Sequence, residues 1–168
     1  QDRVELRLQD YRDLDGRFDH VVSIEMFEAV GEAYWPGYFA MLRDRLQPGG
    51  RAVVQTITIA EAKFERYRTG TDFIQQYIFP GGMLPSPGRF REVADAQGLA
   101  VAEMHFFGLD YAETLRRWHE QFNSVAREVE IRGFDARFRR IWRFYLAYCE
   151  AGFRARATDV MHALLVHA

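Results

Sequence analysis

Three polar residues stand beside apolar runs where a binding site would form. Glu28 follows the apolar run Val21 to Ile24, and the region just beyond a parallel strand is where open α/β sheets bind ligands. Tyr111 has a hydroxyl that can donate to an anion and a ring that can line an apolar pocket. Gln55 also donates, without changing its charge near neutral pH. These residues are therefore candidates for a binding site; a solvated or helix-capping Glu28 and a core-packed Tyr111 are the alternatives.

Other candidate groups carry weaker signals. Glu25 is a second carboxylate, three residues before Glu28, that faces either a cofactor or solvent. Cys149 is the single cysteine, and a lone cysteine on a helix among aromatic residues is more often a small buried hydrophobe than a nucleophile. The five histidines show no metal-ligand spacing, so no metal site is predicted.

The stretch "TDFIQQYIFPGGMLPSPGRF", from Thr71 to Phe90, combines aromatic residues with turn formers. Glycine takes positive φ readily, while each proline fixes its own φ and restricts the residue before it. The stretch therefore predicts a sharp, stiff turn surrounded by apolar side chains.

Periodic patterns predict the elements that position these groups. "RVELRLQ" alternates and predicts a short strand, and Val21 to Ile24 predicts a strand buried on both faces of a parallel sheet. A helix in "YWPGYFAMLRDRLQPGG" is expected to stop at Pro48-Gly49-Gly50, before a strand in "RAVVQTITI". The later expected elements are a helix over Pro87–Gln97 closed by Gly98, a strand over Leu99–Phe107, long helices over Tyr111–Ile131 and Phe134–Phe153, and a strand in "DVMHALLVHA". This order predicts an open α/β fold.

Composition narrows the class of protein. The 168 residues suffice for one domain, and a net charge of −2 gives no general attraction to nucleic acid. A single cysteine fits a reducing compartment, and no apolar run is long enough to cross a bilayer. Because the chain opens without methionine and already in strand-like alternation, we expect it to be part of something longer.

Five segments occur in the same order and at similar spacings in a known enzyme family. They are "FDHVVSIEMFEAVG", "LQPGGRAVVQTITI", "YIFPGGMLPS", "DYAETLRRW" and "CEAGFRAR". On these segments, which span nearly the whole chain, it resembles bacterial cyclopropane-fatty-acyl-phospholipid synthases and the related mycolic acid cyclopropane synthases. Those enzymes are class I methyltransferases that use S-adenosylmethionine. The resemblance implies methyl or methylene transfer to the cis double bond of unsaturated acyl chains of membrane phospholipids, forming cyclopropane fatty acids.

The resemblance also implies a Rossmann-like α/β sheet that is truncated here. Family members carry a Gly-rich loop after the first strand, which lets the backbone approach the cofactor. This sequence has no such loop, since its "PGG" lies between a helix and a strand. We therefore expect residues 1–168 to be the C-terminal portion of a single methyltransferase domain, with a helical lid inserted at about 111–153. The isolated chain is expected to bind S-adenosylmethionine weakly or not at all and to be inactive.

Catalytic roles follow from the resemblance. The family's base is a bound bicarbonate, which we expect to contact Glu28, Gln55, Tyr111 and the backbone of Ile57. Many family members have histidine where this chain has Gln55, so ring closure is less certain than anion binding. A fatty-acyl C-methyltransferase giving methyl-branched or methylene products, or an inactive lipid-binding fragment, is the alternative. Cys149 matches a family cysteine and is carried as a catalytic candidate.

The cofactor has expected contacts of its own. Tyr11 matches the family position that flanks the adenine ring, with Gln9, Asp10 and Arg12 around it. The alternative is a surface loop, because "DYRDLDG" is also a good turn sequence.

The acyl chain is expected to lie in a channel beside this site. The channel residues implied by the resemblance are Tyr77, Phe79, Trp118 and Tyr145, with Phe122, Trp142 and Tyr148 completing an aromatic lid; core packing and a stiff connector are the alternatives. A basic patch of Arg137, Arg139, Arg140, Arg143, Arg154 and Arg156 is either a membrane contact or a solvated helix face. We expect a cytoplasmic protein peripheral to the inner face of the membrane, which pairs as a homodimer if a sheet edge is exposed.

Overall fold

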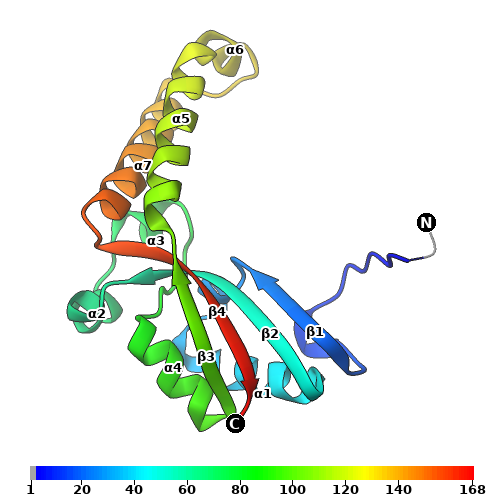
Figure 1. Cartoon of the computed structure of the whole chain (residues 1–168). Helices are drawn as coiled ribbons and strands as arrows, with labels where there is room; N and C mark the ends of the chain where they lie inside the picture. Colours follow the sequence, from blue (N-terminus) through cyan, green and yellow to red (C-terminus); the bar gives the residue numbers. More distant parts are fainter. Residues whose placement is uncertain (1–2) are drawn as a thin grey trace.

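The computed structural model describes residues 3–168 as a four-stranded sheet with helices on one face and a helical arm at one end (Figure 1). The strands are β1 (Phe18–Ile24), β2 (Leu46–Ile59), β3 (Leu99–Phe106) and β4 (Thr158–His167), in the spatial order β1-β2-β4-β3. β1 and β2 are parallel, whereas β4 is antiparallel to both β2 and β3. The predicted α/β class is therefore confirmed.

The predicted helices occur in the predicted order, together with two short helices, Glu61–Arg68 and Phe73–Tyr77, that were not predicted. They are α1 (Trp35–Arg45), α2 (Glu61–Arg68), α3 (Phe73–Tyr77), α4 (Pro87–Ala96), α5 (Gly108–Ser124), α6 (Ala126–Ile131) and α7 (Ala136–Arg154), with 3-10 turns η1 (Tyr11–Asp13), η2 (Phe27–Ala29) and η3 (Glu32–Tyr34). Local chemistry sets the ends of α4: Ser86 Oγ accepts from the backbone N–H of Arg89, and Gly98 takes a φ of 79° just past the helix.

The core lies between the sheet and the helices α1 and α4 (Figure 1). Its centre is Phe27, which is fully buried. The ring centroid of Phe27 lies 5.1 Å from Trp35, 5.0 Å from Tyr38, 5.4 Å from Phe39 and 5.3 Å from Phe90. Because Phe27 belongs to η2, this aromatic cluster also fixes the turn that follows β1.

The opposite face of β1 is open. Val22 is 66% exposed and Ile24 is 64% exposed, so the prediction that this strand is buried on both faces is wrong. β1 is the edge strand of the sheet, and its outward-facing side chains meet no helix among residues 3–168 (Figure 1). The sequence pattern shows that residues 21 to 24 are mostly apolar, but it does not show whether another element covers them.

Two other local predictions are wrong. The segment "RVELRLQ" forms no strand but runs away from the body (Figure 1), with Leu6 and Leu8 fully or almost fully exposed, because none of the described strands lies beside it. Pro48-Gly49-Gly50 does not stop α1: the helix ends at Arg45, Leu46 is already extended, and the three residues lie within β2.

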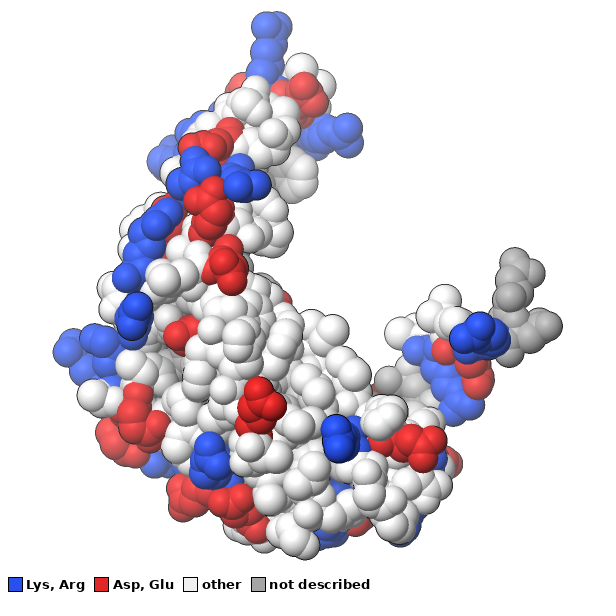
Figure 2. All heavy atoms as spheres, viewed as in Figure 1, with Lys and Arg blue, Asp and Glu red and all other residues white. Residues whose placement is uncertain are grey.

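Helices α5, α6 and α7 form an arm that projects from the sheet (Figure 1). α5 begins three residues before the predicted start, because the Asp159 carboxylate accepts from the backbone N–H of Gly108 at 2.7 Å. The predicted single helix to Ile131 is divided at Val125 into α5 and α6. Charged side chains line the outer edge of the arm, while its inner side is mostly uncharged (Figure 2). Among residues 3–168, no helix has the length and apolar character needed to span a membrane.

Candidate active site

Four polar side chains meet beyond the carboxyl end of β1. Gln55 Nε2 donates to Tyr111 Oη at 2.8 Å and to Glu25 Oε1 at 3.0 Å. Tyr111 Oη donates to the same Glu25 oxygen. On the other side of the amide, Gln55 Oε1 lies 2.8 Å from His162 Nε2. The Glu25 carboxylate thus accepts hydrogen bonds from Gln55 and Tyr111, and the His162 imidazole contacts the amide of Gln55.

Glu25 occupies this place through an unusual backbone conformation. Its φ is +50°, in the left-handed region, where a residue other than glycine costs about 1 kcal/mol or more. Its backbone N–H donates to the Gln55 carbonyl at 2.9 Å, which ties the strained residue to β2. The strain is therefore compensated by contacts that direct the carboxylate toward Tyr111.

The Tyr111 phenol remains a donor in this arrangement. Burial, and then the hydrogen bond and negative charge of Glu25, raise the pKa of Tyr111 well above its ordinary value. The hydroxyl therefore keeps its proton and directs it at Glu25.

Glu28 lies beside this network and is more buried than Glu25. Its Oε1 accepts from the backbone N–H of Ile57 at 2.5 Å, while Oε2 is buried without a hydrogen-bond partner among residues 3–168. Burial raises the pKa of Glu28, with a smaller contribution from the charge of Glu25, and the Ile57 amide partly opposes the shift. This carboxyl is therefore harder to ionise than a free glutamate.

The residues predicted to bind an anion are arranged differently in the structure. Gln55 and Tyr111 do contact each other, and Glu28 reaches Ile57 two residues along β2. However, the Ile57 amide is taken by Glu28, and the two side-chain donors are taken by Glu25. A bicarbonate ion would meet two carboxylates and no free donor from this set, so the residues as arranged do not fit it.

His162 is the site residue that sequence reasoning missed. The histidines were considered only for metal-ligand spacing, which His162 lacks. Its role comes from the antiparallel β2–β4 register, in which Gln55 and His162 are directly paired. A one-residue slip in register would turn the imidazole to the other face of the sheet.

The turn-rich stretch from Thr71 to Phe90 is hydrogen-bonded to the backbone of the site. The backbone N–H of Met83 donates to the Glu28 carbonyl at 2.9 Å, and the N–H of Ile59 donates to the Pro85 carbonyl at 3.0 Å. These bonds hold η2 against the end of β2. The stretch is therefore a structural support, which was one of the two predicted alternatives.

The four predicted channel residues do not line one common hollow. Phe79 and Tyr145 form a pair with ring centroids 6.4 Å apart. Trp118 belongs to a hollow of about 280 Å³ between α5 and α7, and Tyr77 belongs to another hollow beside α3. Burial raises the pKa of Tyr145 to about 12. Of the four residues, Tyr145 belongs to the same apolar cluster as Tyr111.

Cys149 is half-buried among the aromatic residues of α7. Burial, followed by the negative charge of Asp72, raises the pKa of the thiol to about 12. A thiol in this state is a poor nucleophile, because the thiolate is the reactive form. The environment agrees with a small packing residue.

The predicted cofactor residues form one turn before β1. Asp10 accepts from the backbone N–H of Arg12 at 2.9 Å and forms an ion pair with its guanidinium at 2.7 Å. Gln9 Nε2 donates to the Asp13 carbonyl. The half-buried Tyr11 ring packs 5.8 Å from Tyr38. The side chains of Gln9, Asp10 and Arg12 therefore bind within the turn, and the Tyr11 ring packs against the core.

The fold and the site together define a class I methyltransferase sheet. It superimposes on the cyclopropane synthase MmaA2 from Mycobacterium tuberculosis with a TM-score of 0.83 at 23% identity, over 98% of this chain and 62% of that one. The mycolic acid cyclopropane synthase CmaA1, solved with SAH and CTAB, gives 0.83 at 26% identity, over 95% of this chain and 59% of that one.

The chain belongs to the mycolic acid cyclopropane synthetase family, whose model matches residues 1–163. It is 44% identical to the tuberculostearic acid methyltransferase UfaA1 of Mycobacterium tuberculosis, over 98% of this chain and 39% of that protein. It is 36% identical to the cyclopropane-fatty-acyl-phospholipid synthase of Escherichia coli K12, over 91% of this chain and 38% of that protein. The chain thus spans about two fifths of the length of these relatives, and the resemblance seen in the sequence is confirmed.

Proposed function

We propose that the chain forms part of an enzyme that transfers a methyl group from S-adenosylmethionine to the cis double bond of an unsaturated phospholipid acyl chain. Family membership supports the methyl transfer, and the mostly uncharged inner side of the arm supports an acyl substrate (Figure 2). The observation that carries the proposal is the Glu25 carboxylate, held by Tyr111 and Gln55 beside an apolar cluster.

The first step, methyl transfer to the alkene, depends mainly on how the protein positions the two reactants. S-adenosylmethionine would supply, when bound, an electrophilic methyl group. The π pair of the double bond would form the new C–C bond while the methyl–sulfur bond breaks and its electron pair stays on sulfur, which leaves a cation on the neighbouring chain carbon. The protein's part is to hold the alkene in line and exclude water. We assign the stabilisation of such a cation to the rings of Tyr145 and Phe79, whose centroids are 6.4 Å apart.

The second step requires a base, and we assign it to Glu25. The carboxylate takes one proton from the transferred carbon. If the freed C–H pair closes onto the cation, the product is a cyclopropane; if a hydride first moves to the cation, the same proton loss gives a methylene group. Tyr111 and Gln55 hold the carboxylate in place, so no bound bicarbonate is required.

A methylene or methyl-branched product is the second candidate. Gln55 cannot carry a proton, unlike the histidine expected from the family, and 44% identity is to a tuberculostearic acid methyltransferase. Both observations favour proton loss without ring closure. Cyclopropane and methylene products are isomers of equal mass, so they must be separated by NMR.

The test uses the full-length gene product that contains this chain, with oleoyl phosphatidylglycerol and trideuteromethyl S-adenosylmethionine. We expect transfer of the labelled carbon with loss of one deuterium. E25Q is expected to lower the rate about 10²- to 10⁴-fold, the usual contribution of a general base. E103Q, which neutralises an exposed carboxylate on β3, is the matched control and should leave the rate unchanged.

A second variant distinguishes Glu25 from bicarbonate. E25G relieves the positive φ and leaves the donors of Tyr111 and Gln55 free, so added formate or bicarbonate should restore part of the activity to E25G but not raise that of the wild type. Full activity of E25Q, or a wild-type enzyme that needs bicarbonate, would show that Glu25 is not the base. No transfer to any unsaturated lipid would remove the proposed function.

A further inference from the structure

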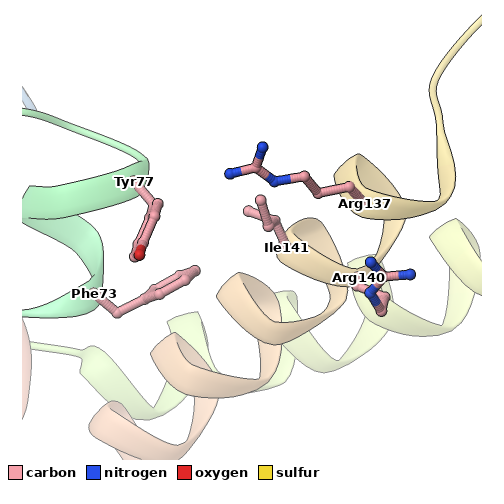
Figure 3. Close-up of a pocket in the computed structure, with 5 residues that line it drawn as sticks. All are labelled: Phe73, Tyr77, Arg137, Arg140 and Ile141. Carbon is pink, nitrogen blue, oxygen red and sulfur yellow. The ribbon is translucent and has the colours of Figure 1, made fainter.

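A hollow at the junction of α3 and α7 combines aromatic and cationic side chains (Figure 3). Its volume is about 220 Å³, and it is lined by Phe73 and Tyr77 from α3 and by Arg137, Arg140 and Ile141 from α7. Arg137 extends across Ile141 toward the Tyr77 ring (Figure 3). An apolar floor with guanidinium groups at its rim suits a ligand that has an oily part and a negative part.

The two arginines of this hollow differ from the neighbouring basic residues. Arg139 pairs with Glu130 at 3.4 Å, Arg143 donates to Asn123 at 2.6 Å, and Arg154 pairs with Glu150. Arg137, Arg140 and, outside the hollow, Arg156 make no ion pair and no side-chain hydrogen bond to residues 3–168.

The predicted basic patch is therefore divided by its contacts. Two guanidinium groups, three positions apart on one face of α7, keep their full donor capacity for a ligand. Such a pair suits a phosphate oxyanion, which accepts several N–H bonds at once.

An apolar path continues from the hollow along the same face of α7. The Phe73 ring contacts Phe144 with centroids 4.6 Å apart and Tyr148 with centroids 6.0 Å apart. Tyr145 follows Phe144 and faces Phe79. The path therefore leads from the hollow to Phe144, the residue next to Tyr145 in α7.

The distances along this path fit a phospholipid. Arg140 and Tyr145 are five residues apart, so the helix rises about 7.5 Å between them. One leaflet of a bilayer has a hydrocarbon thickness of about 15 Å, so a double bond near mid-chain lies about 7–8 Å below the headgroup region. Along the helix axis, a phosphate at Arg140 is thus level with mid-chain carbons at Tyr145. Because the two residues lie about 140° apart around the helix, the acyl chain must turn around α7 as it runs along it.

We propose that this hollow binds the phosphate of an anionic phospholipid, with Arg137 and Arg140 as its donors, while one acyl chain runs along α7 toward Tyr145. The inference rests on the proposed function for the identity of the lipid. It adds a headgroup site that selects substrates by charge, at a distance from the reacting carbons.

Binding is tested without S-adenosylmethionine, so that the result does not depend on catalysis. The full-length gene product is titrated with nanodiscs of palmitoyl-oleoyl phosphatidylglycerol or of palmitoyl-oleoyl phosphatidylcholine. We expect at least tenfold tighter binding to phosphatidylglycerol, and R137S/R140S should reduce this preference to within twofold of none. R51S/R66S removes two exposed guanidinium groups elsewhere and should keep the preference.

Each other outcome overturns the inference. If R137S/R140S keeps the preference for phosphatidylglycerol, the hollow is not the headgroup site. If R51S/R66S loses the preference equally, binding depends only on the overall positive charge of the protein. If soluble glycerophosphoglycerol at millimolar concentration displaces the protein, a free phosphate ester rather than the lipid is bound. The methyl-transfer assay separates the two proposals: absence of transfer with an intact, arginine-dependent preference removes only the proposed function.

Discussion

His162 Nε2 lies 2.8 Å from Gln55 Oε1, and the two residues are direct partners in the antiparallel β2–β4 ladder. Because the imidazole donates to the amide oxygen, the amide nitrogen of Gln55 must point to Tyr111 and Glu25. The orientation of one neutral amide, and hence the position of the carboxylate, is set by a residue on a different strand.

His162 should therefore act as a positioning residue. H162F removes the donor but keeps a ring beside Phe107, and we expect kcat to fall about fivefold, the value of one hydrogen bond of about 1 kcal/mol, with KM unchanged. H162Q retains a donor and should recover most of the loss. Steady-state kinetics test this, with H105F on the neighbouring strand as the control. Equal rates for H162F and the wild type would exclude the role.

Glu28 should make stability depend on pH. Because burial raises the pKa of Glu28 above its value in the unfolded chain, about 4.5, the folded state retains this proton to higher pH. Its contribution to stability is complete below pH 4.5 and is lost as pH rises through the folded pKa. E28Q keeps the acceptor for Ile57 and carries no charge, so at pH 7–8 it should melt about 2–4 °C above the wild type, equivalent to about 1 kcal/mol.

Thermal unfolding between pH 4 and pH 8 measures this effect. The difference between E28Q and the wild type should shrink toward pH 4–5, whereas E103Q should show no such trend. A difference that stays constant across this range would mean that Glu28 is not the group responsible.

The Cys149 thiol should be unreactive and should not be needed for methyl transfer. With its pKa at about 12, only about one thiol in 10⁴ is ionised at pH 8, so alkylation by iodoacetamide should be slow until the protein is unfolded in urea. C149A should keep activity within about threefold of the wild type. A loss above a hundredfold, with an unchanged melting temperature, would restore a catalytic role.

Phe27 should be a principal determinant of stability. It is fully buried among four aromatic rings, so F27A should lower the free energy of unfolding by about 3–5 kcal/mol. F79A, at a position 58% exposed, should change it by less than about 0.5 kcal/mol. Urea unfolding of both variants decides this; similar losses would indicate that η2 is not fixed by its aromatic core.

Much of the fold could be predicted because the signals are local. The β-branched run of β2 and the Gly98 that follows α4 both act within a few residues, through backbone sterics and hydrogen bonds. Where prediction failed, a distant partner decided the outcome. The apolar residues of β1 are exposed because nothing among residues 3–168 covers that face, and "RVELRLQ" forms no strand because none lies beside it.

The candidate site divides in the same way. Residue types were enough to name Gln55 and Tyr111, and their side chains do meet. The fold was needed to show that Glu25 accepts from both of these donors and that His162 orients the amide. Those contacts join residues 30 to 107 positions apart, through one left-handed backbone conformation and the pairing of two strands distant in the sequence. The hydrophobic periodicity of each segment, taken alone, specifies neither the left-handed residue nor which distant strand becomes the partner.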